Sequence, residues 1–299
     1  MPEGRSQAAV EYLITYGWAI IIIGVVVIVF YSLGLFDPYT YAPKAGAGTC
    51  YVVRPQAVIG VQPYLSGDCK NEVPNFVAQF NGKTSYVVTG DSYFALGDAQ
   101  RSAVMWIYLR NVTTDTIPEG YGTYSTTDGK QYVSIWSYGF TTLNPQILFG
   151  DNQENFYGPS NRLNGGQWYF IGYSYSGGAS NTVTVYLDNI SQTFNMGVAL
   201  NTTLPATQAA FIGAGLGGYD YGFFNGSIAN VQVYNTSLST NEIEALYKEG
   251  IGGAPINLQN LVGWWPLDGN ANDYSGNNNT GTGYNVSYSN KWYNGYTTP

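Results

Sequence analysis

The feature that most constrains this chain is an uncharged, mostly apolar run of 24 residues, Leu13–Phe36. As an α-helix it would reach ~36 Å, enough to cross the hydrocarbon core of a bilayer, which is roughly 30 Å thick. Asp37-Pro38 ends the pattern, because the residue before a proline avoids the helical conformation. A cleaved secretory signal peptide has a shorter apolar core and a small-residue exit, and this run has neither. The sequence therefore predicts a long hydrophobic transmembrane or filament-core helix over residues 7–37.

The residues before this run, MPEGRSQAAVEYLITYGWAIIII, resemble an archaeal class III signal peptide, the start of type IV pilin-like subunits. In that family a short polar leader precedes a Gln, and a Glu stands four residues later, directly before the apolar helix. Gln7 and Glu11 hold these places. The resemblance implies that a prepilin peptidase removes a leader of residues 1–6, cutting between Ser6 and Gln7.

The leader departs from the family pattern at one point. Family leaders usually end in Lys-Gly or Arg-Gly before the Gln, whereas Gly4-Arg5-Ser6 precedes it here. Cleavage after Gly4 or after Arg5 therefore stays open beside cleavage before Gln7.

Glu11 has a chemical role in a filament. Removal of the leader exposes a new α-amino group, and a charge buried among packed helices is costly unless it is paired. A carboxylate one helical turn along neutralises the amine of its own or of an adjacent subunit. The alternative is that Glu11 only marks the membrane interface.

The composition changes abruptly after Pro38. Residues 38–74 are punctuated by Pro and Gly, and we expect a stalk or cap there. The chain has two cysteines, Cys50 and Cys69, both in this segment. Outside the cell two lone cysteines indicate one disulfide; two free buried thiols are the alternative.

Short strand patterns broken by Gly, Asn and Asp follow from about residue 75, several of them with period-two alternation. They cover residues 76–80, 85–89, 102–109, 131–138, 167–175, 182–188, 209–215 and 227–234. One soluble helix is expected, capped by Ser239-Thr240 and ending at Gly250. Many short strands at steady spacing predict a mainly β chain with an antiparallel two-sheet sandwich or jelly roll.

Several of these segments resemble the concanavalin A-like, laminin-G-like jelly roll. FVAQFNGKTSYV (76–87) is similar to its early strand pair, and SAVMWIYL (102–109) and GQWYFIGYSY (166–175) to later strands. The segment from Phe224 to Tyr247 resembles its closing strand and helix. The resemblance covers residues 75–249 and implies a lectin-like sandwich.

The segment LVGWWPLDGNANDYSGNNNTGT (261–282) resembles the first strand and loop of the same family, yet it follows the closing helix. A circular permutation gives this order, so we expect a sandwich domain over 75–299, with 261–299 supplying the permuted first strands. A truncated second repeat is the alternative, but about 39 residues cannot bury a second core. Trp264 and Trp265 must therefore pack on their own sandwich or, as added strands, on a neighbouring subunit.

Composition excludes several function classes. The chain has no His, which removes Ser-His and Cys-His nucleophiles and His-ligated zinc. Its net charge is −8 and its 11 Lys and Arg are scattered, so we expect no nucleic-acid partner.

Glycan hydrolases that share this sandwich need two facing carboxylates. The E-x-D-x-x-E strand of the laminarinase-like enzymes is missing. The pair Asp151 and Glu154 lies in an Asn-rich turn, and Glu242 and Glu244 lie on the surface helix. The sequence predicts no enzyme.

The resemblance also implies a calcium site, because the Asp-x-Ser-Gly loop of the family often joins one. Asp273 matches, and oxygens at Gly276 and Asn279 would add ligands. The departure is at Ala229-Asn230, where the family commonly has acidic residues. An Asx-turn without metal is the alternative. No other cofactor is expected.

Glycosylation is expected on Asn-x-Ser/Thr sequons in surface loops. Seven occur, at Asn111, Asn189, Asn201, Asn225, Asn235, Asn278 and Asn285.

Together these features predict a structural subunit of an archaeal type IV pilus-like filament at the cell surface, with an outward lectin-like domain for adhesion. Its partners would be other copies of itself, the prepilin peptidase, the membrane before assembly, and surface glycans. A monomeric, membrane-anchored lectin or adhesin that does not polymerise is the alternative. Shielding of the helical core by a hydroxyl-rich coat is the alternative to adhesion.

Overall fold

In the computed structural model the chain forms two compact units, residues 1–44 and residues 45–299. The structure describes residues 16–26, 28, 49–55, 62–69, 73–111, 116–122, 132–138, 146–150, 155–158, 163–197, 199–204, 210–215 and 222–299.

In the first unit, residues 16–26 and residue 28 are helical. Their large apolar side chains are exposed, from 42% at Val26 to 68% at Ile20. Among the described residues, no helix combines the length and the apolar character that a membrane crossing needs. The long helix predicted over residues 7–37 is thus seen only as this short piece. The remainder of it, with Ser6, Gln7 and Glu11, lies outside the described residues.

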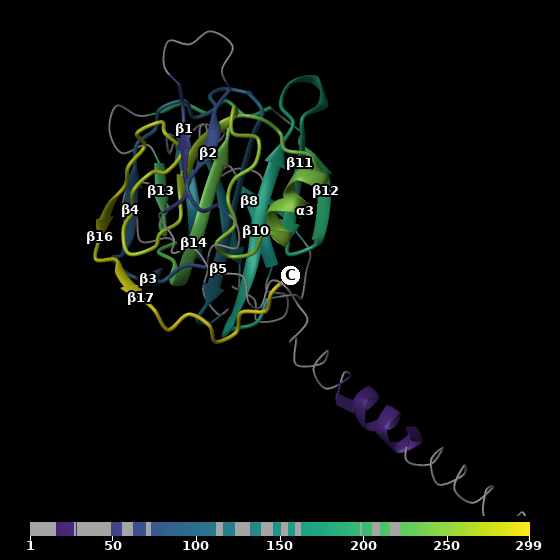
Figure 1. The fold of residues 1–299 in the computed structure, drawn as a ribbon. Coiled ribbons are helices and arrows are strands. Elements are labelled where there is room, and N and C mark those ends of the chain that lie inside the picture. Colours follow the sequence, from purple (N-terminus) through teal and green to yellow (C-terminus); the bar gives the residue numbers. More distant parts are fainter. Residues whose placement is uncertain are drawn as a thin grey trace, which may run out of the picture. The chain divides into compact units, whose positions relative to one another are not determined.

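The second unit is an antiparallel sandwich of two sheets (Figure 1). The smaller sheet has seven strands, in the spatial order β16 (Thr282–Tyr284), β4 (Tyr86–Thr89), β13 (Ala210–Ile212), β6 (Thr116–Gly122), β7 (Tyr132–Tyr138), β8 (Gln146–Gly150) and β9 (Asn155–Tyr157). The larger has eight: β12 (Ile190–Asn195), β11 (Thr182–Leu187), β10 (Gln167–Tyr175), β5 (Arg101–Leu109), β14 (Asn225–Tyr234), β3 (Val77–Asn81), β17 (Ser287–Ser289) and β15 (Leu261–Trp265), which also pairs with β14. The predicted mainly β sandwich is confirmed.

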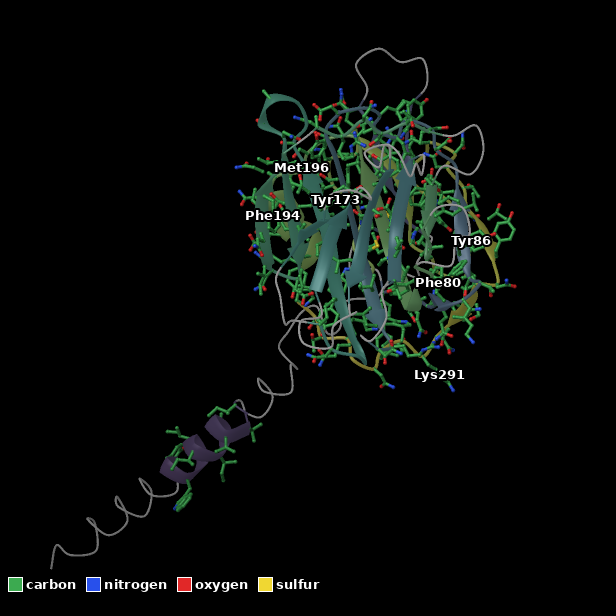
Figure 2. The ribbon with its side chains drawn as sticks, turned by 180° about the vertical axis from the view of Figure 1, so that it is seen from behind. Phe80, Tyr86, Tyr173, Phe194, Met196 and Lys291 are labelled. Carbon is green, nitrogen blue, oxygen red and sulfur yellow. A yellow bond between two sulfur atoms is a disulfide. The ribbon has the colours of Figure 1, made fainter. Side chains whose placement is uncertain are left out.

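Alternating side chains of both sheets meet in the core between them. Val183, Val185 and Leu187 of β11 point inward, as the period-two pattern of that strand predicts. Figure 2 shows Tyr173 of β10 and Phe80 of β3 within the sandwich. Because this core needs one face of each sheet, the opposite faces are left for other contacts.

A second apolar cluster covers the outer face of the eight-stranded sheet. Helix α3 (Thr240–Lys248) packs there through Ile243 and Leu246. Trp106 of β5 stacks on Tyr247 of the helix, with ring centroids 5.9 Å apart. Ser239 forms the N-cap of α3 in a capping box with Glu242, which confirms the predicted start of the helix.

The C-terminal segment packs on the sandwich of its own chain. β15 pairs with the second half of β14, while β3 pairs with the first half of β14. β16 pairs with β4 in one sheet and β17 with β3 in the other. Trp264 and Trp265 are buried on opposite sides of the larger sheet, in the outer cluster and the inner core. The segment therefore closes the edge of both sheets.

The cysteines lie on a hairpin of β1 (Tyr51–Val53) and β2 (Tyr64–Ser66), which belongs to the second unit. Cys50 and Val52 are buried in the outer cluster. The backbone N–H of Val52 donates to the carbonyl of Tyr274 at 2.9 Å. The described part of the expected stalk or cap therefore packs on the sandwich.

Candidate binding site

Four side chains form a straight row across one end of the eight-stranded sheet. The strand register pairs Gln79 with Ser227, Ser227 with Tyr108, and Tyr108 with Trp168. Directly paired residues of antiparallel strands share a face of the sheet, with Cβ atoms roughly 5 Å apart. Trp168 belongs to the outer cluster, so the whole row lies on the outer face. The row is the floor of a pocket that α3 does not cover.

The C-terminal tail forms the wall of this pocket. The indole Nε1–H of Trp168 donates to the carbonyl of Trp292 at 2.8 Å, and that of Trp292 donates to the carbonyl of Pro74 at 2.9 Å. The backbone N–H of Trp168 donates to the carbonyl of Gly295. Gly295 has φ +76°, and a Cβ there would lie 2.2 Å from the carbonyl oxygen of Gly166, so only glycine lets the tail approach this closely.

Floor and wall enclose a pocket of about 230 Å³, which lies below the roughly 300–1,000 Å³ typical of drug-sized ligands. The floor row, Arg110 at the end of β5, and Lys291, Trp292 and Asn294 of the tail line it. Ser227 is 5% exposed. Within the described part of the chain, six lining side chains form no hydrogen bond or ion pair: Gln79, Tyr108, Arg110, Ser227, Lys291 and Asn294. The pocket thus combines aromatic rings with hydrogen-bonding groups that remain free for a ligand.

The residues expected to bind calcium are already saturated by the protein. Asp273 Oδ1 accepts from the N–H groups of Trp264 and Ser275, and its Oδ2 accepts from the hydroxyl of Ser275 and the N–H of Asn279. The side-chain oxygen of Asn279 accepts from the N–H of Ser92.

These donors occupy the side-chain oxygens of Asp273 and Asn279 that calcium would need. Calcium takes six to eight oxygen ligands. No cluster of three Asp, Glu, Cys or His side chains that could hold a metal occurs among the described residues. A calcium site at Asp273, Gly276 and Asn279 therefore does not fit this structure. The four hydrogen bonds of Asp273 organise the loop.

Arg54 braces the same loop from the disulfide-bonded hairpin. Its guanidinium donates to the carbonyls of Ser275, Leu258 and Leu261. Burial lowers the pKa of this arginine from its ordinary value, and the nearby Asp273 carboxylate raises it. Gly276 fits against this brace, because a Cβ there would lie 2.9 Å from the carbonyl oxygen of Val52. Gly276 is thus a packing residue.

A model of the concanavalin A-like lectin/glucanases superfamily matches residues 81–244, more than half of the chain. The chain belongs to this superfamily. The matched range begins within β3 and ends within α3. It leaves out β15–β17 and the tail. Four of the eight residues that line the pocket therefore lie within the matched range, Gln79 lies just before it, and three lie on this chain's C-terminal tail.

One solved structure agrees with the superfamily fold. A candidate carbohydrate-binding protein from Bacteroides ovatus ATCC 8483 is similar with a TM-score of 0.56, at 14% identity over 81% of this chain and 69% of the other. A heptameric SAP-like pentraxin from Limulus polyphemus has a TM-score of 0.46, at 16% identity over 65% of this chain and 92% of the other. The sialyllactose-bound CBM40 of a Ruminococcus gnavus IT-sialidase has a TM-score of 0.42, at 12% identity over 58% of this chain and 100% of the other. At such identities the likeness shows the fold alone. No curated protein matches the chain.

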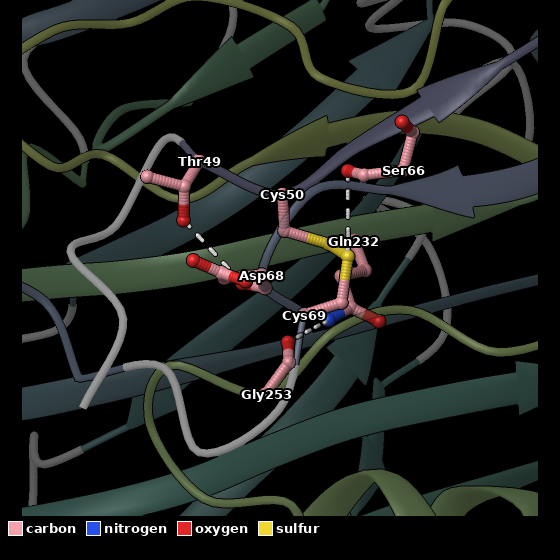
Figure 3. The surroundings of a disulfide bond; sticks show 7 residues. All are labelled: Thr49, Cys50, Ser66, Asp68, Cys69, Gln232 and Gly253. Atoms are coloured by element: carbon pink, nitrogen blue, oxygen red, sulfur yellow. Dashed lines mark hydrogen bonds between the residues drawn. A yellow bond between two sulfur atoms is a disulfide. The ribbon is translucent and has the colours of Figure 1, made fainter. Parts of the chain in front are cut away.

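Cys50 and Cys69, predicted to pair, form a disulfide that closes the β1–β2 hairpin (Figure 3). Figure 3 shows it beside Gln232 and Gly253. The side-chain amide of Gln232 donates to the carbonyl of Gly253 at 3.2 Å. The disulfide therefore fastens the hairpin over a buried polar network of the superfamily sandwich.

The sequons lie mostly where an oligosaccharide has room. Six of the seven asparagines are exposed: Asn111, Asn189, Asn201, Asn235, Asn278 and Asn285. Asn225 is half-buried at the start of β14, and its side chain lies against Gly82. The side-chain amide of Asn285 donates to the carbonyl of Thr84 at 3.3 Å. Asn225 is thus the least accessible of the seven.

The carboxylates considered for catalysis have structural partners where they are described. Glu242 caps α3, and Glu244 pairs with Lys248 on the helix surface. Asp151 and Glu154 lie outside the described residues.

One further carboxylate, Glu119 of β6, is 2% exposed. Burial raises its pKa to about 8. It pairs across the sheet with Ile212, a residue of the inner core, so it faces the inter-sheet core. That position is closed to a substrate.

Proposed function

We propose that this chain is a cell-surface protein whose sandwich binds saccharides in the pocket between the floor row and the C-terminal tail. One observation favours this function. Aromatic rings line the same small pocket as hydrogen-bonding side chains that have no partner among the described residues. Pockets of this kind place a few polar groups among aromatic ones to fix the orientation of a ligand.

The size and chemistry of the pocket suit a single sugar ring. A sugar offers hydroxyl groups, which both donate and accept, and a C–H face that packs on aromatic rings. Gln79 and Asn294 offer amides that also donate and accept, and Ser227 offers a hydroxyl. The ring centroids of Tyr108 and Trp168 lie 5.7 Å apart, and both rings line the pocket. The indole N–H of Trp168 is already used to hold the wall, so only its ring is left for the ligand.

The N-terminal segment fits a type IV pilin-like subunit that presents this module on a filament. The support is the string from Gln7 to the apolar run, together with the exposed apolar side chains of residues 16–26. A helix that is apolar all round needs lipid or other copies of itself to cover it. Repetition along a filament makes weak saccharide sites effective through avidity. A monomeric anchored lectin needs the same helix and is the alternative.

In this proposal the protein is membrane-inserted as a precursor, is processed by a prepilin peptidase, and performs no catalysis itself. N-terminal mass spectrometry of the surface protein is expected to find a mature chain that starts at Gln7. An intact Met1 would contradict the pilin assignment and leave the anchored lectin. Negative-stain microscopy of cells with and without the protein then distinguishes a filament from an anchor.

A glycan array probed with the full-length chain tests saccharide binding. We expect bound glycans whose signal falls in the Gln79→Ala and Ser227→Ala variants. The matched control is Gln192→Ala, which removes the same side chain from an exposed position on β12. An array without signal, or a signal that all variants share, would contradict the proposed site.

A further inference from the structure

We propose that the pocket recognises an anionic saccharide, one whose ring carries a carboxylate or a sulfate group. This inference depends on the proposed function and adds a ligand class to it. It starts from the distribution of positive charge, which is unusual in this chain.

Cations are scarce in this protein, and half of those described are already engaged. The chain has 11 Lys and Arg against 19 Asp and Glu. Six of the basic residues are described. Arg54 donates to three carbonyls, Arg101 is buried in a hydrogen-bonded network with Tyr121 and Thr202, and Lys248 pairs with Glu244.

The three remaining described cations are Lys83, Arg110 and Lys291, and none of them has an ion pair with a described residue. Arg110 and Lys291 both line the pocket, and among the described residues no Asp or Glu lines it. Lys291 lies at the lower end of the sandwich in Figure 2. Two of three unengaged cations thus meet at one hollow, on a protein whose net charge is −8.

The neighbours of the two cations explain why the ligand would be a sugar acid and not a free inorganic ion. Tyr108 and Trp168 supply ring surface to a pocket that is larger than a small anion needs. The free amides of Gln79 and Asn294 match hydroxyl groups. Arg110 stands at the end of β5 and Lys291 on the tail, so they approach the pocket from two elements. The cations would hold the acidic substituent while the floor holds the ring.

The energetic contribution of each cation is modest, because both side chains are exposed. Exposed ion pairs change an equilibrium about two- to fivefold, and salt screens them. The two together predict about a tenfold preference for the anionic form of a sugar at low salt.

The test compares three probes by titration of the full-length chain: methyl β-glucuronide, glucose 6-sulfate and methyl β-glucoside. We expect one or both anionic probes to bind about tenfold more tightly than the neutral glucoside, with the preference reduced by added salt. Arg110→Gln and Lys291→Gln should each weaken the anionic probes about two- to fivefold relative to the glucoside, so that the preference for the anionic form falls. Lys83→Gln removes the same charge from outside the pocket and should change nothing.

Equal affinity for the three probes, or an anion preference that neither Arg110→Gln nor Lys291→Gln reduces, would overturn the inference. In the first case neutral glycans on the array still support the proposed function. Absence of binding by all three probes also counts against the inference, whereas the proposed function is judged by the whole array. The relative affinity of glucuronide and sulfate identifies which acidic group is preferred.

Discussion

The indole Nε1–H of Trp168 donates to the backbone carbonyl of Trp292, 124 residues later in the chain, at 2.8 Å. This contact ties the central strand β10 to the C-terminal tail and makes one pocket out of two distant segments. It also means that the pocket exists only while the tail stays docked.

Trp292→Ala should therefore weaken both the fold and the pocket. Trp292 is 5% exposed, and loss of a large buried aromatic costs about 3–5 kcal/mol of unfolding free energy. Trp292→Phe keeps most of the ring but leaves the carbonyl of Pro74 without its donor, and should cost about 1 kcal/mol. Denaturant unfolding measures both. Tyr293→Ala, at a neighbour that is 63% exposed, is the control. If Trp292→Ala lowers the free energy of unfolding no more than Tyr293→Ala does, docking of the tail does not stabilise the fold and the prediction is contradicted.

Glu119 should make stability fall as the pH rises. Burial raises its pKa to about 8 in the folded chain, while the ordinary value is 4.5. The folded state therefore keeps a proton that the unfolded state releases, so the stabilisation is complete below about pH 4.5 and is lost as the pH rises through about 8.

The expected loss between pH 5 and pH 8 is on the order of 3 kcal/mol of unfolding free energy. Glu119→Gln should flatten this dependence, whereas Glu244→Gln on the helix surface should preserve it. Denaturant titrations of the wild type and both variants at the two pH values measure these unfolding free energies. If the Glu119→Gln variant keeps the wild-type dependence of unfolding free energy on pH, another titratable group causes that dependence.

Asp273 should stabilise the chain without any metal. Its two oxygens accept four hydrogen bonds from Trp264, Ser275 and Asn279. Asp273→Ala leaves buried donors unpaired, and each costs about 1–3 kcal/mol. We expect a large loss of thermal stability that is the same with calcium and with chelator. A wild-type melting temperature that rises on addition of calcium, and does so only when Asp273 is present, would restore the metal site.

Much of the fold could be predicted from local sequence. The alternation of Val183, Val185 and Leu187 identified β11, and Ser239 identified the start of α3. Strand β6 was not predicted, because its residues Pro118, Gly120 and Gly122 are typical of turns. The strand tolerates them since its register shifts between Thr116 and Glu119, around the proline that cannot donate.

The pocket could not be predicted in the same way. Gln79, Tyr108, Trp168 and Ser227 each occupy an outward position in a strand that was recognised. Only the order and register of β3, β14, β5 and β10 place them in one row, and these depend on contacts between distant segments. The surroundings of Asp273 could not be predicted for a related reason: the motif stands in the sequence, but a spacing pattern does not show the four donors that bond to its oxygens.

The most direct test of the central claim uses the indole N–H signals of the seven tryptophans in an NMR titration of the full-length chain. Trp168→Phe and Trp292→Phe assign two of the signals. On addition of a glycan that binds on the array, we expect the signals of Trp168 and Trp292 to shift, while that of Trp265, buried in the inner core, stays unchanged. A bound glycan that leaves Trp168 and Trp292 unmoved would place the saccharide site elsewhere and contradict this account.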